Sequence, residues 1–267
     1  MVGKVERYLL TSIQEKKAIF IPLIDPEEVT ASSASLLAEE GEKAGASAIM
    51  VGGSTVVSSE ILNGVVKAIK ESVDIPIILF PNNITGISKY ADAIWFMSLL
   101  NSADPYFIIG AQVLAAPLIK KLRIEPIPLG YLILGEGGAA AVVGKAHPIP
   151  YNKPGLVVAH ALAAQFLGMR FIYLEGGSGV SKPVPSAIVR MVKSTVNLPL
   201  LVGGGIRTKE QAKEIVRAGA DIIVASTVLE NENPESVGIK IREILEGIKE
   251  GASHRYMSSS GEGEDED

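Results

Sequence analysis

Three consecutive glycines end an apolar run near the carboxyl end of the chain, in LLVGGGIR (residues 200–207). Because glycine has no side chain, backbone N–H groups in such a turn can approach an anion closely. A helix expected from Thr208 onward would point its positive end toward the same place. The next apolar run ends in Ser226 and Thr227, whose hydroxyl and N–H groups can complete the cradle. This spacing predicts a phosphate site, and a plain tight turn is the alternative.

A carboxylate opens a second glycine-rich turn, in YLEGGSG (residues 173–179). Alternate side chains of a strand face the same way, so Tyr173 and Glu175 are expected on one face. A carboxylate at the mouth of a site can act as a general base or hold a substrate hydroxyl. The flexible turn, with Ser178, can fold further N–H groups around a phosphate. A structural glutamate satisfied by the backbone is the alternative interpretation of Glu175.

Asp25 ends the first apolar run, in LIDPEE, and Ser54 follows the second, in VGGST. Asp25 can cap the next helix, which Pro26 would open. It can equally bind Mg²⁺, which prefers one or two carboxylates together with phosphate oxygens of a substrate. Ser54 or Thr55 can cap a helix or add an oxygen ligand to that ion. The residues alone leave both interpretations open, and no three histidines or carboxylates have the spacing of a zinc site.

These candidate residues all follow apolar runs, and the chain has eight such runs, which are continuous rather than alternating. Strands that are buried on both faces, as in a parallel sheet covered by helices, have this pattern. The runs lie at residues 18–24, 47–53, 76–80, 93–100, 126–134, 171–177, 198–205 and 221–226.

Amphipathic stretches separate the runs, except at the third connection, around residues 84–90, which is too short for a full helix. Repeated strand–helix units imply parallel strands joined by right-handed crossovers. Eight units in 267 residues favour a TIM-type (β/α)8 barrel with a shortened or irregular third helix. An open doubly wound sheet is the competitor, but no GxGxxG follows the first run. Helices are expected near residues 27–44, 58–71, 105–122, 155–168, 183–195, 208–218 and 234–250.

We expect one barrel domain over residues 1–256 and a disordered acidic tail over residues 257–267, MSSSGEGEDED. The net charge of −5 argues against nucleic acid as a partner, which requires a basic surface. The absence of cysteine excludes disulfides and thiolate chemistry. No apolar stretch is long enough to span a membrane, and the N-terminus lacks a signal-peptide pattern, so a cytoplasmic protein is expected.

Six motifs, LIDP, GGS, SLLNS, GYLIL, YLEGGSG and VGGGIR, occur in an order and spacing that resemble a known family. The chain is similar, over roughly residues 5–250, to the geranylgeranylglyceryl phosphate synthase family of archaeal ether-lipid enzymes and to their bacterial relatives that use longer prenyl chains. The resemblance implies a Mg²⁺-dependent prenyltransferase. Its reaction would join geranylgeranyl diphosphate to the 3-hydroxyl of sn-glycerol 1-phosphate and release diphosphate, the first committed step of archaeal ether-lipid synthesis.

The resemblance also implies roles for individual residues. Asp25 and Ser54 would hold the Mg²⁺ ion, and Glu175 would take the proton of the glycerol hydroxyl. Glycerol phosphate would be bound by Tyr173, Leu174, Glu175, Gly176, Gly177, Ser178 and Gly179, with Gly204, Gly205, Ser226 and Thr227 on its phosphate. The prenyl tail would need an apolar groove, whose candidate lining residues are Trp95, Phe96, Tyr106, Phe107, Tyr131 and Leu132.

Two positions depart from the family pattern. Ser226 stands where the family usually has glycine, which adds a side chain where close backbone approach is expected, and Phe20 stands where relatives often carry histidine. Two other functions remain as alternatives: a flavin- or sugar-phosphate-binding isomerase or oxidoreductase, and a non-catalytic binder of a phosphate ligand. The intact Asp25 and Glu175 argue against the second. The family also implies a homo-oligomer, with a hexamer favoured over a dimer, and work close to the membrane surface.

Overall fold

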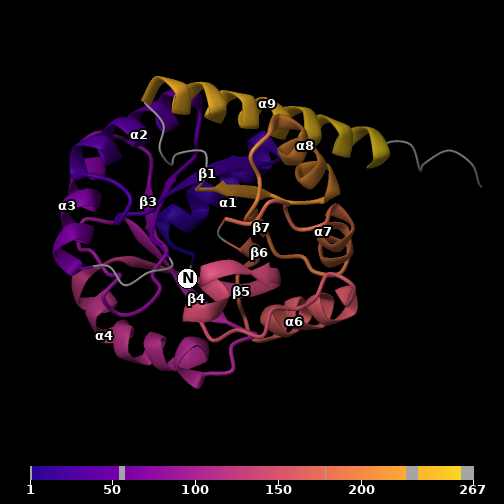
Figure 1. The fold of residues 1–267 in the computed structure, drawn as a ribbon, viewed down its shortest axis with the longest axis horizontal. Coiled ribbons are helices and arrows are strands. Elements are labelled where there is room, and N and C mark those ends of the chain that lie inside the picture. The colour runs from indigo at the N-terminus through magenta and orange to yellow at the C-terminus, as the bar shows by residue number, and fades with distance from the viewer. Residues whose placement is uncertain (1, 54–57, 178, 227–233, 260–267) are drawn as a thin grey trace, which may run out of the picture.

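Eight parallel strands close into a barrel in the computed structural model, which describes residues 2–53, 58–177, 179–226 and 234–259 (Figure 1). The strands follow one another around the barrel in chain order, and the last pairs with the first. Each expected apolar run coincides with one strand, with β5 extending beyond its run at both ends, so the predicted barrel is confirmed. The strands are β1 Ile19–Ile24, β2 Ile49–Val51, β3 Ile77–Leu79, β4 Ala93–Leu99, β5 Glu125–Gly137, β6 Phe171–Gly177, β7 Leu200–Gly203 and β8 Ile222–Ala225.

Helices surround the barrel at the places that the amphipathic stretches predict. They are α2 Ala31–Ala44, α3 Ser59–Lys70, α4 Ala111–Leu122, α6 Pro154–Phe166, α7 Ser186–Lys193, α8 Lys209–Ala218 and α9 Pro234–Ser259. A π-helix, η1 (Tyr106–Gly110), leads into α4, and a short helix, α5 (Gly138–Val143), follows β5. The helix expected near residues 105–122 covers both η1 and α4, although its π-helical start was not predicted, and the sequence did not predict α5.

The third connection is the exception that the sequence predicted. Residues 80–92, between β3 and β4, form turns and contain no helix. No helix therefore stands between β3 and β4 in chain order.

Two helix boundaries differ from those predicted. α2 starts at Ala31 rather than near residue 27, because Thr30 and Ser33 form a reciprocal capping box that fixes its first turn. α9 continues to Ser259, so the helix includes residues 257–259 of the expected tail. The rest of that tail, residues 260–267, lies outside the described residues.

Alternate residues of each strand face the barrel interior and the helix layer. Side chains such as Trp95 and Phe171 fill the interior and pack edge to face, with ring centroids 5.2 Å apart. Phe20, on β1, belongs instead to the layer between strands and helices and is fully buried there. Its departure from the family pattern therefore changes the outer core and does not alter the barrel mouth.

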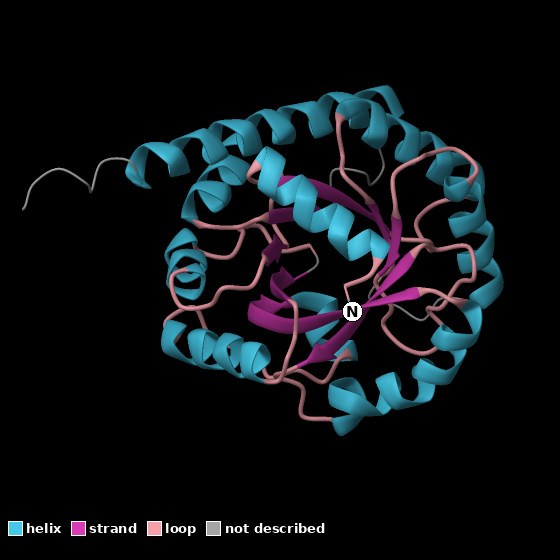
Figure 2. Cartoon of the chain, turned by 180° about the vertical axis from the view of Figure 1, so that it is seen from behind, coloured by secondary structure: helices cyan, strands magenta, loops and turns pink. Residues whose placement is uncertain are grey.

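Helix α1 (Lys4–Lys16) covers the amino-terminal end of the barrel, at the near side in Figure 2. Its residues Val5 and Leu9 join the interior core. The carboxylate of Glu125 accepts hydrogen bonds from the N–H groups of Val5 (2.8 Å) and Glu6 (2.9 Å), which satisfies the first turn of α1. Arg170 pairs with the buried Glu6 at 2.6 Å. This end of the barrel is thus closed by packing and charge pairing.

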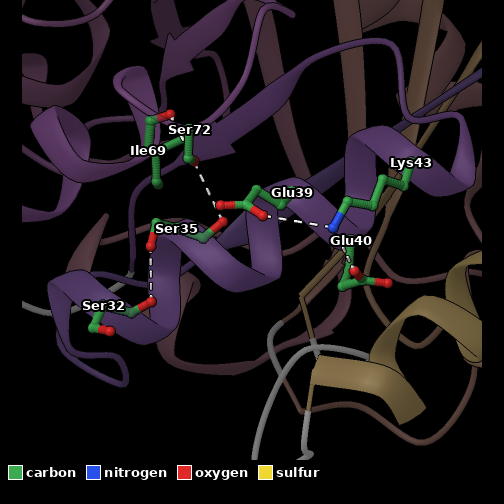
Figure 3. A network of polar contacts seen from close by, with 7 residues as sticks. All are labelled: Ser32, Ser35, Glu39, Glu40, Lys43, Ile69 and Ser72. Carbon is green, nitrogen blue, oxygen red and sulfur yellow. Dashed lines mark hydrogen bonds and ion pairs between the residues drawn. The ribbon is translucent and has the colours of Figure 1, made fainter.

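Polar contacts far from the mouth join α2 to the end of α3 and stabilise α2 itself. Figure 3 shows Ser72, just after α3, donating to the carbonyl of Ser35 in α2 at 3.4 Å. Within α2, Lys43 pairs with Glu39 (3.5 Å) and Glu40 (3.0 Å). Such exposed pairs each contribute little to stability. Among the residues described, none of the helices has the length and apolar character needed to cross a bilayer.

Candidate active site

One large cavity opens at the carboxyl ends of the strands, with a volume of about 1410 Å³ including its open mouth. This is the end at which β/α barrels carry their active sites. The cavity has a polar part inside the mouth, lined by residues such as Asp25, Glu175 and Gly205. It continues as an apolar groove between β4 and α4, lined by residues such as Phe96 and Ala115.

Glu175, at the end of β6, is the buried carboxylate of this mouth, with only 7% of its surface exposed. Its Oε1 accepts a hydrogen bond of 2.6 Å from the N–H of Gly177, and the hydroxyl of Tyr173 also donates to the carboxylate. Burial raises the pKa of Glu175, and the two hydrogen bonds oppose that rise. A carboxylate with a raised pKa in a cleft is suited to accept a proton.

An aromatic cluster forms the floor beneath Glu175. Tyr131 and Tyr173 lie 5.2 Å apart by ring centroid, and Phe80 packs against both, at 5.3 and 5.6 Å. Burial raises the pKa of Tyr173 well above its ordinary value, and the charge of Glu175 raises it further. Both tyrosines therefore remain neutral, and the hydroxyl of Tyr173 serves as a hydrogen-bond donor to Glu175.

The glycines after β7 are required by close packing. A Cβ on Gly204 would lie 2.5 Å from Oε1 of Glu175, and one on Gly205 would lie 2.6 Å from the backbone of Lys182. Both glycines also have positive φ angles, of 81° and 74°, which side chains rarely adopt. The turn after β7 is thereby drawn against the turn after β6, and both glycines line the mouth.

Asp25 lies at the end of β1 and lines the same mouth. Its Oδ1 accepts a hydrogen bond of 3.0 Å from the N–H of Glu27, and Oδ2 lies 2.2 Å from the position of a Cβ on Gly53. Asp25 is not the N-cap of α2, because Thr30 has that role. Ser54, the second expected Mg²⁺ ligand, follows Gly53 directly and lies outside the described residues.

The described residues contain no group of three or more histidine, cysteine or acidic side chains that could hold a metal. A site for Mg²⁺ at Asp25 would therefore depend on one carboxylate, a neighbouring hydroxyl and oxygens of a substrate. Such hard oxygen donors fit Mg²⁺, which usually takes one or two carboxylates and substrate phosphates.

The structure brings most of the remaining expected residues to the mouth. Gly177, Gly179 and Ser226 line it, whereas Gly176 is buried behind the hydroxyl of Tyr151. Leu174 is different, because its side chain points away from the interior into the core under the helices. Ser178 and Thr227 lie outside the described residues.

The apolar groove agrees in part with the expected lining. Trp95, Phe96, Phe107 and Tyr131 line the cavity. Leu132 does not, because it faces the helix layer, and Tyr106 packs its ring on Phe107 outside the cavity. The sequence missed the contribution of α5, whose Ala140 and Val143 close one side.

Tyr151, in the loop after α5, is a further residue near the site. Its phenol ring occupies the space that a Cβ on Gly135 would need, at 2.4 Å, and its hydroxyl lies 3.4 Å from the position of a Cβ on Gly176. Partial burial raises its pKa, and the charges of Glu175 and Glu136 add to the rise. The only signal in the sequence was its position in a polar loop after the fifth strand.

A closed parallel barrel with a buried carboxylate of raised pKa at its mouth defines a β/α-barrel enzyme. The chain belongs to the PcrB family, whose model matches residues 11–248, and it is a prenyltransferase of that family.

The relatives are similar over nearly their whole length. A geranylgeranylglyceryl phosphate synthase from Thermofilum pendens is 51% identical over 96% of this chain and 99% of its own length. One from Pyrococcus abyssi is 51% identical over 93% of this chain and 99% of its own. A crystal structure of (S)-3-O-geranylgeranylglyceryl phosphate synthase from Thermoplasma acidophilum, in complex with its substrate sn-glycerol-1-phosphate, is 40% identical. It covers 94% of this chain and 100% of that one, with a TM-score of 0.87.

Proposed function

We propose that the enzyme forms the ether bond between the 3-hydroxyl of sn-glycerol 1-phosphate and geranylgeranyl diphosphate, with Mg²⁺. The observation that carries this proposal is the continuity of the cavity. Its mouth holds the buried Glu175 beside the glycine turn, and an apolar groove leads away from that mouth toward α4. A phosphorylated small acceptor fits the first part, and a long apolar tail fits the second. The crystal structure of the Thermoplasma acidophilum relative with sn-glycerol-1-phosphate supports the choice of acceptor.

The chemistry follows from these positions. The hydroxyl oxygen of the acceptor attacks the allylic carbon of the donor, the bond from that carbon to the diphosphate oxygen breaks, and diphosphate leaves with the electron pair. Glu175 takes the hydroxyl proton, a contribution of about 10²–10⁴-fold. Tyr173 holds Glu175 in place through its hydroxyl. The acceptor phosphate is expected at Gly204 and Gly205, with Gly177, Gly179, Ser226 and the backbone of Leu174 and Gly176 shaping its surroundings.

Asp25, with Ser54, would hold Mg²⁺, which when bound offsets the negative charge that develops on the leaving diphosphate. Asp25 suits this role because its carboxylate abuts the glycine turn after β2 at the rim of the mouth.

The direct experiment supplies purified protein with Mg²⁺, sn-glycerol 1-phosphate and geranylgeranyl diphosphate and detects the ether product by mass spectrometry. Product is expected from the wild type and should fall at least about a hundredfold in Glu175→Gln. It should be lost with chelator and in Asp25→Asn. Glu136→Gln is the matched control, because this exposed carboxylate also lies close to Tyr151 yet does not line the cavity. Absence of product from folded wild-type protein would refute the proposal.

We also propose a homo-oligomer, with a hexamer favoured over a dimer. Exposed apolar side chains on two different helices support this. On the outer side of α4, Val113 is 62% exposed, and at the end of α6, Phe166 is 79% exposed. A dimer needs one self-complementary interface, whereas a hexamer assembled from dimers needs two different interfaces.

The long tail of the proposed donor and product further suggests that this cytoplasmic enzyme works at the membrane surface. Flotation of the purified protein with liposomes would detect such an association, and recovery only in the lipid-free fraction would contradict it.

A further inference from the structure

The wall of the barrel is open between β3 and β4 near the mouth. β3 pairs with β4 only at Ile78–Ala93 and Leu79–Ile94, whereas β4 continues to pair with β5 as far as Leu99. From Trp95 onward, β4 therefore has no strand on its β3 side. The third connection adds no helix over this opening. The cavity passes through this gap, which we call the β3–β4 seam, and continues along α4.

A side chain of α4 makes a hydrogen bond that a neighbouring strand would otherwise make with β4. The amide nitrogen of Gln112 donates to the carbonyl of Met97 on β4 and, at 3.3 Å, to the carbonyl of Phe107 in η1. The N–H of Leu100 donates to Tyr131 on the β5 side, so the alternating backbone turns Met97 toward the seam. Gln112 therefore satisfies a backbone carbonyl that a longer β3 would otherwise have bonded.

The face of α4 that borders the groove carries small side chains, which leave space between α4 and β4. It consists of Ala111, Gln112, Ala115 and Ile119, and Ile119 is the one buried residue of α4. Helices on a barrel normally bury large apolar side chains against the strands. Here the two alanines leave the space between α4 and β4 unfilled. Polar contacts hold this region instead. Gln112 connects the first turn of α4 to β4, and the hydroxyl of Ser98 donates to the carbonyl of Ile108 in η1 at 2.7 Å.

The second polar atom of Gln112 has no protein partner. Its Oε1 is buried and accepts no hydrogen bond among the described residues. Burying an unpaired acceptor costs free energy, so an apolar side chain of the same size would be more favourable there if packing alone mattered. What the amide provides is a fixed separation between α4 and β4. π-Helices such as η1, which carries one of its two acceptors, are also frequent at functional sites.

We propose that Gln112 is a positioning residue for the donor: it holds η1 and α4 at the separation from β4 that lets the apolar tail pass through the β3–β4 seam. This inference rests on the proposed function and names the side chain that keeps the tail groove open. Gln112 takes no part in the chemistry at Glu175.

The test compares donors that do and do not reach the seam. Gln112→Met keeps the length of the side chain and removes both donated hydrogen bonds. With geranylgeranyl diphosphate, KM is expected to rise by about tenfold or more, because the groove narrows or shifts when the tie to Met97 is lost. With dimethylallyl diphosphate, whose tail ends before the seam, kcat and KM should stay within about twofold of the wild type. The KM for sn-glycerol 1-phosphate should also be unchanged.

A binding measurement accompanies the kinetics. Trp95 is the single tryptophan of the chain and lines the cavity, so its fluorescence reports occupancy of the groove. Titration with geranylgeranyl diphosphate in the absence of acceptor should show weaker binding to Gln112→Met. Lys120→Met, on the exposed side of the same helix, is the matched control and should bind as the wild type does.

The outcomes distinguish failure of the proposed role of Gln112 from failure of the proposed function. Equal effects of Gln112→Met on the long and the short donor, or no effect on either, would overturn the role of Gln112. If the wild type transfers neither prenyl chain to sn-glycerol 1-phosphate, the proposed function itself fails, and the inference falls with it. Turnover of the short donor by Gln112→Met also shows that the variant is folded.

Discussion

Oε1 of Glu175 lies 2.5 Å from the point at which a Cβ would stand on Gly204. The carboxylate at the end of β6 thus fills the space that any side chain after β7 would need. The same oxygen accepts a hydrogen bond of 2.6 Å from the N–H of Gly177, which also lies close to Gly204. The orientation of Glu175 consequently depends on the turn after β7 as well as on the end of its own strand.

Gly204→Ala should displace Glu175 and lower turnover by about 10²–10⁴-fold, the range expected for loss of a general base. Its backbone φ of 81° adds strain. Gly168→Ala is the matched control, because Gly168 has a φ of 84° and nothing within 4 Å of a Cβ. Thermal unfolding and steady-state rates measure both variants. The control should lose about 1 kcal/mol of stability and keep its activity. Similar activities in the two variants would contradict a role for Gly204 in positioning the Glu175 carboxylate.

Glu175→Gln should stabilise the protein at neutral pH. Because burial raises the folded-state pKa of Glu175 above its ordinary 4.5, the folded protein keeps this proton at pH values where the unfolded chain has released it. Stability from this group is therefore present at low pH and is lost as the pH rises from near 4.5 through the raised pKa. The melting temperature of Glu175→Gln should exceed that of the wild type at pH 7 and match it at pH 4.

The raised pKa of Glu175 also determines how activity depends on pH. The base form of Glu175 is populated only above its raised pKa, so the acid limb of the kcat/KM profile should have its midpoint above 4.5. A midpoint at or below that value would show that Glu175 is not the titrating base.

Arg170→Met should destabilise the fold by about 3 kcal/mol, because it leaves the carboxylate of Glu6 buried without its cation. The catalytic constants should not change, since this pair lies at the opposite end of the barrel from the mouth. Lys67→Met breaks an exposed pair with Glu71 at 3.8 Å and should cost less than about 0.5 kcal/mol. Denaturant unfolding measures the loss of stability in each variant. Equal losses in Arg170→Met and Lys67→Met would show that the carboxylate of Glu6 is solvated.

Phe166→Glu should dissociate the proposed oligomer. Phe166 is 79% exposed at the end of α6, a helix without a single charged residue, and a carboxylate there would be buried in any interface that covers it. Light scattering after gel filtration measures the mass. Ile239→Glu, at a 53% exposed position on α9, should leave the mass unchanged. An unaltered mass in Phe166→Glu would place the interface elsewhere.

The sequence predicted the barrel because each strand is a continuous apolar run, a pattern that few folds share. It also predicted the missing third helix from the length of the connection around residues 84–90. α1 was missed because its charged, weakly apolar sequence gives no sign that Val5 and Leu9 pack into the barrel end. The start of α2 was placed too early, since the capping box at Thr30 decides it and not the apolar pattern.

At the site, motif and strand alternation together were enough to place Glu175 beside the glycines of β7. Leu174 shows the limit of a motif, because the residue between Tyr173 and Glu175 faces the opposite side of the strand. The β3–β4 seam could not be predicted, because the number of residues in an apolar run does not reveal where pairing with the neighbouring strand ends.

Closure of the barrel joins the two ends of the sequence. Ile19 of β1 pairs with Ile222 of β8, and α9 packs on both α8 and α2. During synthesis, β1 must therefore wait with an unpaired edge until almost the whole chain has been translated. Contacts of such large sequence separation fold slowly, and open strand edges invite association with other chains. Premature termination anywhere before β8 would leave a half-built sheet whose natural fate is aggregation or degradation.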